Sequence, residues 1–223
     1  MIEIKNLYLK YIREYYALFN INLTINDGDT VAFVGGNLSG RTTLLRVIAG
    51  LEKYDSGEIY INNRDLASVD FKCDVNLGYV PEVPVFFDNK SVYDNLKYVL
   101  AERKISKTEI EEKINKALID FNIEKYKNIK IKDLDLYEKY IICFVRLSLR
   151  KLDYLLVDNI FDKLNEDEAE AFVKLIDDLF VSKKITTIIV AEKYDLLKPI
   201  CSRCINFDEG SISETTAQQN QDE

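Results

Sequence analysis

The sequence of 223 residues contains no histidine. This absence excludes histidine-based acid–base chemistry, histidine metal sites and Ser-His-Asp triads. No run of about 18 apolar residues occurs, so we expect no transmembrane helix. The first residues, Met1–Lys5, also lack the charged-then-apolar layout of a secretory signal peptide. Together these absences predict a chain that stays in the cytoplasm.

Cysteine is scarce: the four residues fit a reducing compartment and make no disulfide framework. Cys201 and Cys204 form a C-x-x-C pair, a spacing found in metal and redox sites. Zinc needs two further ligands, but Cys73 and Cys143 have no metal-type spacing around them. The pair also runs into the apolar stretch Ile205–Phe207 instead of opening a helix. We therefore interpret these residues as ordinary half-buried thiols.

Positive charge is in deficit, with a formal net charge of −8. This balance argues against nucleic acid as a partner, because phosphate backbones favour a basic surface. The chain is 47% hydrophobic and 30% charged, which is typical of a soluble globular domain. Its length is sufficient for one large domain, or two lobes, with a sizeable core.

A glycine loop between a strand and a helix is the most informative feature that is present. The strand-like run Val31–Val34 precedes Gly35, and an apolar helical pattern follows Thr42. The loop matches the phosphate-binding P-loop pattern G-x-x-x-x-G-K-[S/T] from Gly35 through Gly40, except that Arg41 replaces the lysine. Glycines let backbone N–H groups approach phosphates, and the helix N-terminus adds positive potential.

Local patterns divide the chain into a core lobe, residues 1–83 plus 151–213, and an inserted helical lobe, residues 84–150. Polar residues from Ser211 onward are expected to be disordered, leaving a tail at 214–223 beyond the domain. Strand-like segments occur at Ile2–Leu9, Leu18–Ile25, Val31–Val34, Leu77–Val80, Tyr154–Asp158, Ile185–Val190 and Ile205–Phe207.

Turn and cap signals lie between these segments. Asn26–Asp29 is predicted to form a hairpin-type turn. In the helical lobe, Ser91 is predicted to cap one helix, and Ser106–Glu109 and Asp135–Glu138 are predicted to form capping boxes for two more.

In the order and spacing of its segments, the chain resembles the ATPase domain of ATP-binding cassette (ABC) proteins over about Met1–Ser213. The resemblance implies a P-loop NTPase of the ABC type, an α/β fold with a mixed-sheet core lobe and an inserted helical lobe. Five further segments carry the resemblance. Leu77–Asp88 is similar to the family's Q-loop segment, and Ser91–Leu96 is similar to the helix that follows it. Tyr154–Asp158 is similar to Walker B, Ile188–Glu192 to the switch segment, and Ile205–Gly210 to the final strand and turn.

The resemblance implies an ATP site with Mg²⁺. An aromatic residue that stacks on adenine corresponds best to Tyr11, with Tyr15 and Tyr16 as alternatives. The phosphate-binding residues would be Gly35, Gly36, Asn37, Leu38, Ser39, Gly40, Arg41, Thr42 and Thr43. The metal ligands would be Thr42, Asp158 and Glu82. Arginine at position 41 keeps the charge but is larger than lysine and not equivalent to it. Nucleotide binding weaker than the family norm is expected, because Glu192 would place negative charge near the γ-phosphate.

Several positions depart from the family pattern. The glutamate that polarises the attacking water is replaced by Asn159, which can hold a water but cannot accept its proton. Glu192 replaces the switch histidine, Glu82 replaces the Q-loop glutamine, and Asn165 occupies the D-loop aspartate position. Leu38 stands where the family usually has an extra glycine.

The signature Leu-Ser-Gly-Gly-Gln corresponds to Leu134, Asp135, Leu136, Tyr137 and Glu138. In the family the serine and glycines present donors to the partner's γ-phosphate. The substitutions put bulk and negative charge there while keeping a good helix start. The residues that start the helix are retained, and the groups that would bind the partner's γ-phosphate are lost.

We weigh three hypotheses. An active transporter motor and a degenerate cassette with a structural or regulatory role both fit the resemblance, whereas an unrelated P-loop kinase explains the glycine loop alone. A cassette acting on DNA is disfavoured by the acidic charge and by the lack of a long coiled-coil insertion. Cassettes pair head to tail, as homodimers or heterodimers, and this chain has altered both its own site and the signature it lends. We therefore favour a hydrolysis-impaired cassette that pairs with a second cassette and a membrane-spanning subunit, peripheral on the inner face of the cell membrane.

Overall fold

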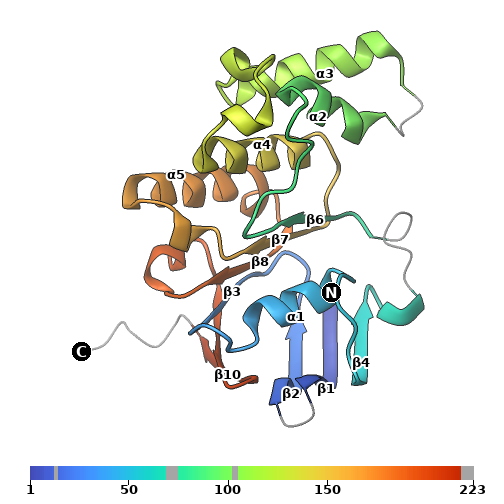
Figure 1. The fold of residues 1–223 in the computed structure, drawn as a ribbon. Coiled ribbons are helices and arrows are strands. Elements are labelled where there is room, and N and C mark those ends of the chain that lie inside the picture. The colour runs from blue at the N-terminus through green and yellow to red at the C-terminus, as the bar shows by residue number, and fades with distance from the viewer. Residues whose placement is uncertain (13–14, 69–74, 102–104, 217–223) are drawn as a thin grey trace. The chain divides into compact units, whose positions relative to one another are not determined.

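The chain divides into two compact units. The computed structural model describes residues 1–12, 15–68, 75–101 and 105–216 (Figure 1). Residues Met1–Glu82 together with Asp153–Glu223 form one unit, called the core unit below, and Val83–Leu152 form the other, the helical unit. None of the helices in the described ranges is long and apolar enough to cross a bilayer.

The described part of the core unit contains two β-sheets and two α-helices. A four-stranded antiparallel sheet has the order β2-β1-β4-β5, and a six-stranded mixed sheet has the order β10-β9-β3-β8-β7-β6. The strands are β1 (Ile2–Ile12), β2 (Tyr15–Ile25), β3 (Thr30–Gly35), β4 (Ser56–Ile61), β5 (Arg64–Asp65), β6 (Leu77–Val80), β7 (Tyr154–Asp158), β8 (Thr186–Ala191), β9 (Arg203–Asp208) and β10 (Ser211–Thr216). The helices are α1 (Arg41–Ile48) and α5 (Glu166–Ile176), which continues as a π-helical turn over Asp177–Val181.

Strands β7 and β8 are buried at every residue, and β3 at all but its last. Parallel strands covered on both faces consist of continuous apolar runs, which is why these three were recognisable in the sequence. Their register brings their carboxyl ends together: Val34 is opposite Ala191, and Asp158 is opposite Val190. Helix α1 contacts strands of both sheets, so one hydrophobic core extends through the unit.

The predicted hairpin turn at Asn26–Asp29 is wrong. This turn leads from β2 in the antiparallel sheet to β3 in the mixed sheet. The hairpin partner of β2 is β1, with Ile2 opposite Ile25. Both strands alternate buried and exposed side chains along most of their length, and this period cannot distinguish which neighbour a strand pairs with.

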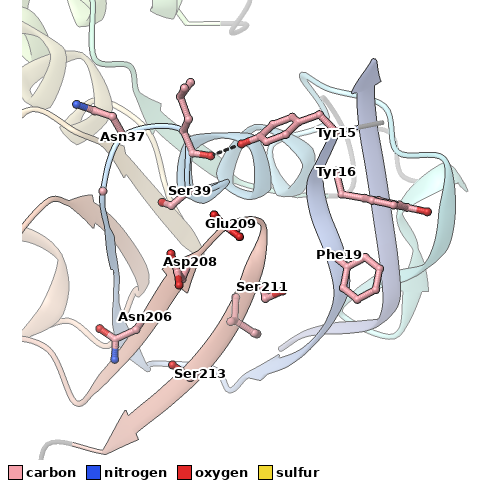
Figure 2. Close-up of a pocket in the computed structure, with 13 residues that line it drawn as sticks. Tyr15, Tyr16, Phe19, Asn37, Ser39, Asn206, Asp208, Glu209, Ser211 and Ser213 are labelled. Carbon is pink, nitrogen blue, oxygen red and sulfur yellow. Dashed lines mark hydrogen bonds between the residues drawn. The ribbon is translucent and has the colours of Figure 1, made fainter. Parts of the chain in front are cut away.

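The β9–β10 hairpin corrects two further expectations. The last strand is β10 and not the segment that ends at Phe207, and Ser211–Thr216 pairs antiparallel with β9 instead of being disordered. Residues 217–223 of the expected tail lie outside the described residues. Glu209 and Gly210 both have positive φ, at 44° and 78°, as a two-residue type I′ hairpin turn requires. The turn donates from the Gly210 amide to Ser39 and lies beside the glycine loop and β2 (Figure 2).

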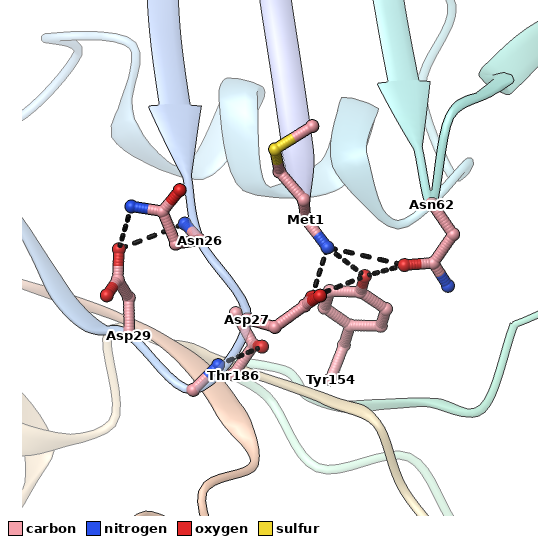
Figure 3. A network of polar contacts seen from close by, with 8 residues as sticks. Met1, Asn26, Asp27, Asp29, Asn62, Tyr154 and Thr186 are labelled. Atoms are coloured by element: carbon pink, nitrogen blue, oxygen red, sulfur yellow. Dashed lines mark hydrogen bonds and ion pairs between the residues drawn. The ribbon is translucent and has the colours of Figure 1, made fainter.

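A polar network joins the two sheets at the start of β1 and β7 (Figure 3). The Tyr154 hydroxyl donates to Oδ1 of Asn62 at 2.5 Å and accepts from the Met1 amino group at 2.9 Å. The same amino group forms an ion pair with Asp27. Burial and the neighbouring Asp27 carboxylate raise the pKa of Tyr154.

The helical unit contains α2 (Val92–Leu100), α3 (Lys107–Asp120) and α4 (Leu136–Ser148) around its own apolar core. The Ser91 and Ser106 caps are confirmed, each accepting from a backbone amide three residues on. The box at Ser106 is only half formed, because the Glu109 carboxylate pairs with Lys113. Asp135 and Glu138 form the complete predicted capping box of α4.

Candidate functional site

The glycine loop follows β3 and opens α1 at the carboxyl ends of the parallel strands. Gly35 has φ +156°, and a Cβ there would lie 2.3 Å from the Phe207 carbonyl oxygen. Gly40 has φ +104°, and its Cβ would lie 2.4 Å from the Ala17 carbonyl oxygen. These glycines therefore let the loop pass directly against neighbouring backbone. A cavity of about 240 Å³ lies over the loop.

Arg41 occupies the position of the P-loop lysine, and its side chain contacts backbone carbonyl oxygens in this structure. Its side chain is only 6% exposed. One terminal nitrogen donates to the Gly36 carbonyl at 3.1 Å, and the other donates to the Ala191 carbonyl. Burial lowers the pKa of Arg41, and the carboxylates of Asp162 and Glu192 oppose that shift. The guanidinium thus joins the glycine loop to the end of β8.

We predict that Arg41→Met destabilises the nucleotide-free protein by about 2 kcal/mol, because the buried Ala191 carbonyl and the partly buried Gly36 carbonyl lose a charged donor. The matched control is Arg46→Met on the same helix. Arg46 forms a surface ion pair with Glu52 at 3.6 Å, and its loss is expected to cost less than about 0.5 kcal/mol. Urea unfolding of both variants measures the difference. Equal effects would contradict a bridging role for Arg41.

Thr42 and Asp158 come together as the sequence predicts for a metal-binding pair. The Thr42 hydroxyl donates to Oδ1 of Asp158 at 2.8 Å, and the Tyr79 hydroxyl donates to Oδ2 at 2.7 Å. Burial raises the pKa of Asp158, and the two hydrogen bonds oppose that shift. Tyr79 was not singled out from the sequence. Its position on β6, the strand that pairs with β7, is the signal that could have found it.

Beyond Asp158 the chain turns sharply at Asn159, which has φ +48°. The Asn159 side chain and the Glu192 backbone lie beside the Asp162 carboxylate. The Asn159 Oδ1 atom is buried and has no hydrogen-bond partner among the described residues. Burial raises the pKa of Asp162, the charge of Glu192 raises it further, and Arg41 opposes the shift. Asp162 is a second residue that sequence reasoning missed.

Three tyrosines were candidates for the adenine contact. Tyr11, which is 55% exposed, shares a hydrogen bond of 3.3 Å with the Thr43 hydroxyl. Tyr15 donates to the Leu38 carbonyl at 2.8 Å (Figure 2). Both line the cavity over the loop. Tyr16 packs against other aromatic rings and does not line that cavity.

The remaining loop and metal candidates also lie around the cavity. Gly36, Asn37 and Ser39 contribute to its wall, as does Glu82. The Glu82 carboxylate forms an ion pair with Lys163 at 3.1 Å. Leu38 is 86% exposed and has φ +63°, a left-handed conformation that is unfavourable for a non-glycine residue.

The signature candidates belong to the helical unit. Leu134 is buried, Asp135 is exposed at the N-cap of α4, and Leu136 is exposed in its first turn. Tyr137 and Glu138 complete that turn, and the Glu138 carboxylate accepts from the Asp135 amide at 3.0 Å. The carboxylates at both ends of the capping box are therefore committed to the helix start.

The ABC transporter family model matches residues 18–162. The chain belongs to the ABC transporter family. It is 30% identical over 222 residues to the methionine import ATP-binding protein MetN of Clostridium acetobutylicum, covering 96% of this chain and 68% of MetN. It is also 30% identical over 217 residues to the sulfate/thiosulfate import ATP-binding protein CysA of Mannheimia succiniciproducens, covering 96% of this chain and 60% of CysA.

The solved structures agree on the fold. The dimeric structure of MJ0796, described as a bacterial ABC transporter cassette, matches with a TM-score of 0.87 at 23% sequence identity. The match covers 98% of this chain and all of the MJ0796 chain. The ABC-type α/β fold expected from the sequence is confirmed.

The residues present fit a hydrated magnesium ion with a nucleotide. The Thr42 hydroxyl and the Asp158 carboxylate, in direct contact, are the oxygen donors that Mg²⁺ prefers. Bound there, the metal would neutralise phosphate charge. No cluster of three or more acidic, cysteine or histidine ligands occurs in the part of the chain that the structure describes, so the metal would depend on the nucleotide for further ligands.

Proposed function

We propose that this chain is the ATP-binding subunit of an ABC transport complex, that it binds nucleotide weakly, and that its hydrolysis is impaired. A membrane-spanning subunit would hold it at the cytoplasmic face of a membrane, and a second cassette, identical or different, would pair with it. Because MetN and CysA are both import subunits by name, import is the direction that these relatives favour.

The observation that carries impaired hydrolysis is the environment of Asn159. The family places a carboxylate here to polarise the attacking water. This chain places an amide, whose Oδ1 atom is buried and has no hydrogen-bond partner among the described residues. An amide cannot accept the proton from water, and a positioned general base contributes roughly 10²–10⁴-fold to rate.

The signature segment, which this chain would present to the second cassette, supports the same proposal. In a head-to-tail pair, each ATP lies between one chain's glycine loop and the other's signature. Asp135, Leu136 and Tyr137 replace the donors of that signature, and the Asp135 side chain already accepts from Glu138. A chain changed in both halves would weaken both composite sites, which suits a structural or regulatory subunit.

The second candidate is an active ATP-hydrolysing motor. The Thr42–Asp158 contact favours it, because the metal-binding pair of a working cassette is retained. The two candidates differ in the turnover of Mg·ATP that they predict for the purified protein. An unrelated P-loop kinase is no longer a candidate, because the family match extends through most of the chain.

We predict that the protein binds ADP about fivefold more tightly than ATP. Glu192 and Asp162 place negative charge around Arg41, and a γ-phosphate would add like charge beside them. Glu192 is exposed, so solvent screens the repulsion to about 1 kcal/mol, which is about fivefold in affinity. Calorimetric titration with each nucleotide, with and without Mg²⁺, gives the two dissociation constants.

Substitution of Glu192 by histidine or glutamine is expected to remove most of this preference. Asp195→Asn is the matched control, because it removes an exposed carboxylate three residues away that is paired with Lys198. It should leave the ADP-to-ATP ratio unchanged. A ratio near one in the wild type, or an unchanged ratio in the Glu192 variants, would refute this account of Glu192.

A further inference from the structure

A second and larger cleft lies beside the glycine loop, between β2 and the β9–β10 hairpin (Figure 2). We call it the hairpin cleft. Its volume is about 940 Å³, which is within the range of sites for small organic ligands. It shares Tyr15 and the segment 36–39 with the nucleotide cavity. The family comparison and the proposed nucleotide chemistry assign no role to its hairpin side.

The charged side chains that line the hairpin cleft are all negative. Asp208 and Glu209 lie in its wall, between the glycine loop and the serines of β10 (Figure 2). Neither carboxylate has an ion-pair or hydrogen-bond partner among the described residues, and no described lysine or arginine lines the cleft. Two uncompensated carboxylates oppose an anionic ligand and attract a cation.

Aromatic rings form the opposite wall. Phe19, which is 47% exposed, packs edge-on against Tyr16 with ring centroids 5.1 Å apart. Aromatic faces attract ammonium and guanidinium groups. One such contact exists beside the cleft: Lys10, which does not line it, has its Nζ 4.1 Å from the centroid of the Tyr16 ring. Phe19 has no comparable cation contact among the described residues.

Neutral polar groups complete the lining. Ser211 and Ser213 of β10 and Asn37 of the glycine loop provide hydroxyl and amide groups. Ser39 also lines the cleft, but its hydroxyl oxygen is buried away from the surface and has no partner among the described residues. An inorganic cation is a poor fit, because no described cluster has three ligating side chains. The lining suits a ligand with a cationic group and a hydrogen-bonding body.

We propose that the hairpin cleft binds an organic cation, through an alkylammonium or guanidinium group held between the two carboxylates and the aromatic wall. The source of that group is either a free polyamine or a basic side chain of a peptide. Tyr15 lies in both cavities and donates to the Leu38 carbonyl of the glycine loop. A ligand in the hairpin cleft would therefore contact the glycine loop directly. The proposal does not depend on nucleotide binding.

The test is calorimetric titration of the nucleotide-free protein with spermidine, and separately with a neutral-ended peptide that carries two arginines. The double variant Asp208→Asn, Glu209→Gln should bind at least about tenfold more weakly, because the cationic group loses both of its charge-assisted contacts. Phe19→Ala should weaken binding about threefold. The double variant Glu112→Gln, Asp178→Asn is the matched control, because it removes two exposed carboxylates elsewhere and leaves the same net charge.

Binding of spermidine that depends on the cleft residues supports a free amine as ligand, and binding of the peptide alone supports a side chain. Thermal unfolding of each variant verifies that it is folded, so a loss of binding reports on the cleft. Two outcomes overturn the proposal: neither probe binds, or both double variants lose affinity equally. Equal loss would show that the polycation responds only to the net charge of the protein.

Discussion

Gly40→Ala is expected to lower the melting temperature by about 6–12 °C, whereas Gly36→Ala in the same loop changes it by less than about 3 °C. At Gly40 a methyl group would lie 2.4 Å from the Ala17 carbonyl oxygen, and the backbone has φ +104°. A contact this short with backbone cannot be relieved by a side-chain rotation. Strain and overpacking together cost about 3 kcal/mol, and each kcal/mol shifts the melting temperature by about 2–4 °C in a chain of this size.

Gly36 is the matched control because a Cβ there meets nothing within 4 Å. The two variants have the same change in composition and the same loop, and they differ in backbone surroundings. Scanning calorimetry of the nucleotide-free proteins measures both. Similar melting temperatures would mean that the loop relaxes freely and that its contact with β2 contributes little to stability.

The features that the sequence predicted are those that depend on near neighbours along the chain. The glycine loop, the N-caps at Ser91 and Asp135 and the buried strand ending at Asp158 each have a local pattern with a physical cause. The loop follows its strand directly, so its position at the carboxyl edge of a parallel sheet also follows from the pattern.

The features that it missed depend on pairing between distant segments. Tyr79 reaches Asp158 because β6 pairs with β7, 77 residues further along the chain by the register of Leu77 and Tyr154. Arg41 reaches the Ala191 carbonyl because β3 pairs with β8. No local pattern specifies these pairings. The same limitation explains the wrong hairpin at Asn26–Asp29, because a turn signal does not identify the sheet of the next strand.

Arg41 is the loop residue whose contacts the sequence pattern did not predict. The loop pattern assigns it to phosphate, since a lysine occupies that position in the motif. The longer, forked side chain can reach two acceptors at once, and here they are backbone carbonyls. Nucleotide binding would have to compete with those contacts, which supports weak binding under the proposed function.

The purified protein is expected to release no phosphate above background from millimolar Mg·ATP, and Asn159→Glu alone is expected not to restore turnover. Restoring a carboxylate returns the factor of a general base only when the γ-phosphate is held in line. The structure adds a second reason. The Asn159 side chain lies beside the Asp162 carboxylate, so a glutamate at this position would place two like charges together.

The assay therefore compares a series of variants: the wild type, Asn159→Glu, Asn159→Glu with Asp162→Asn, and Asn159→Glu with Glu192→His and the sequence Ser-Gly-Gly at 135–137. The effects are expected not to add, because a base, an in-line phosphate and signature donors act as a unit. Turnover should therefore rise only in the last variant. Thr42→Ala is the control that removes the hydroxyl in contact with Asp158. Robust wild-type turnover that is lost in Thr42→Ala would establish an active motor, and the substitutions at Asn159 and Glu192 would then be compatible with catalysis by other groups.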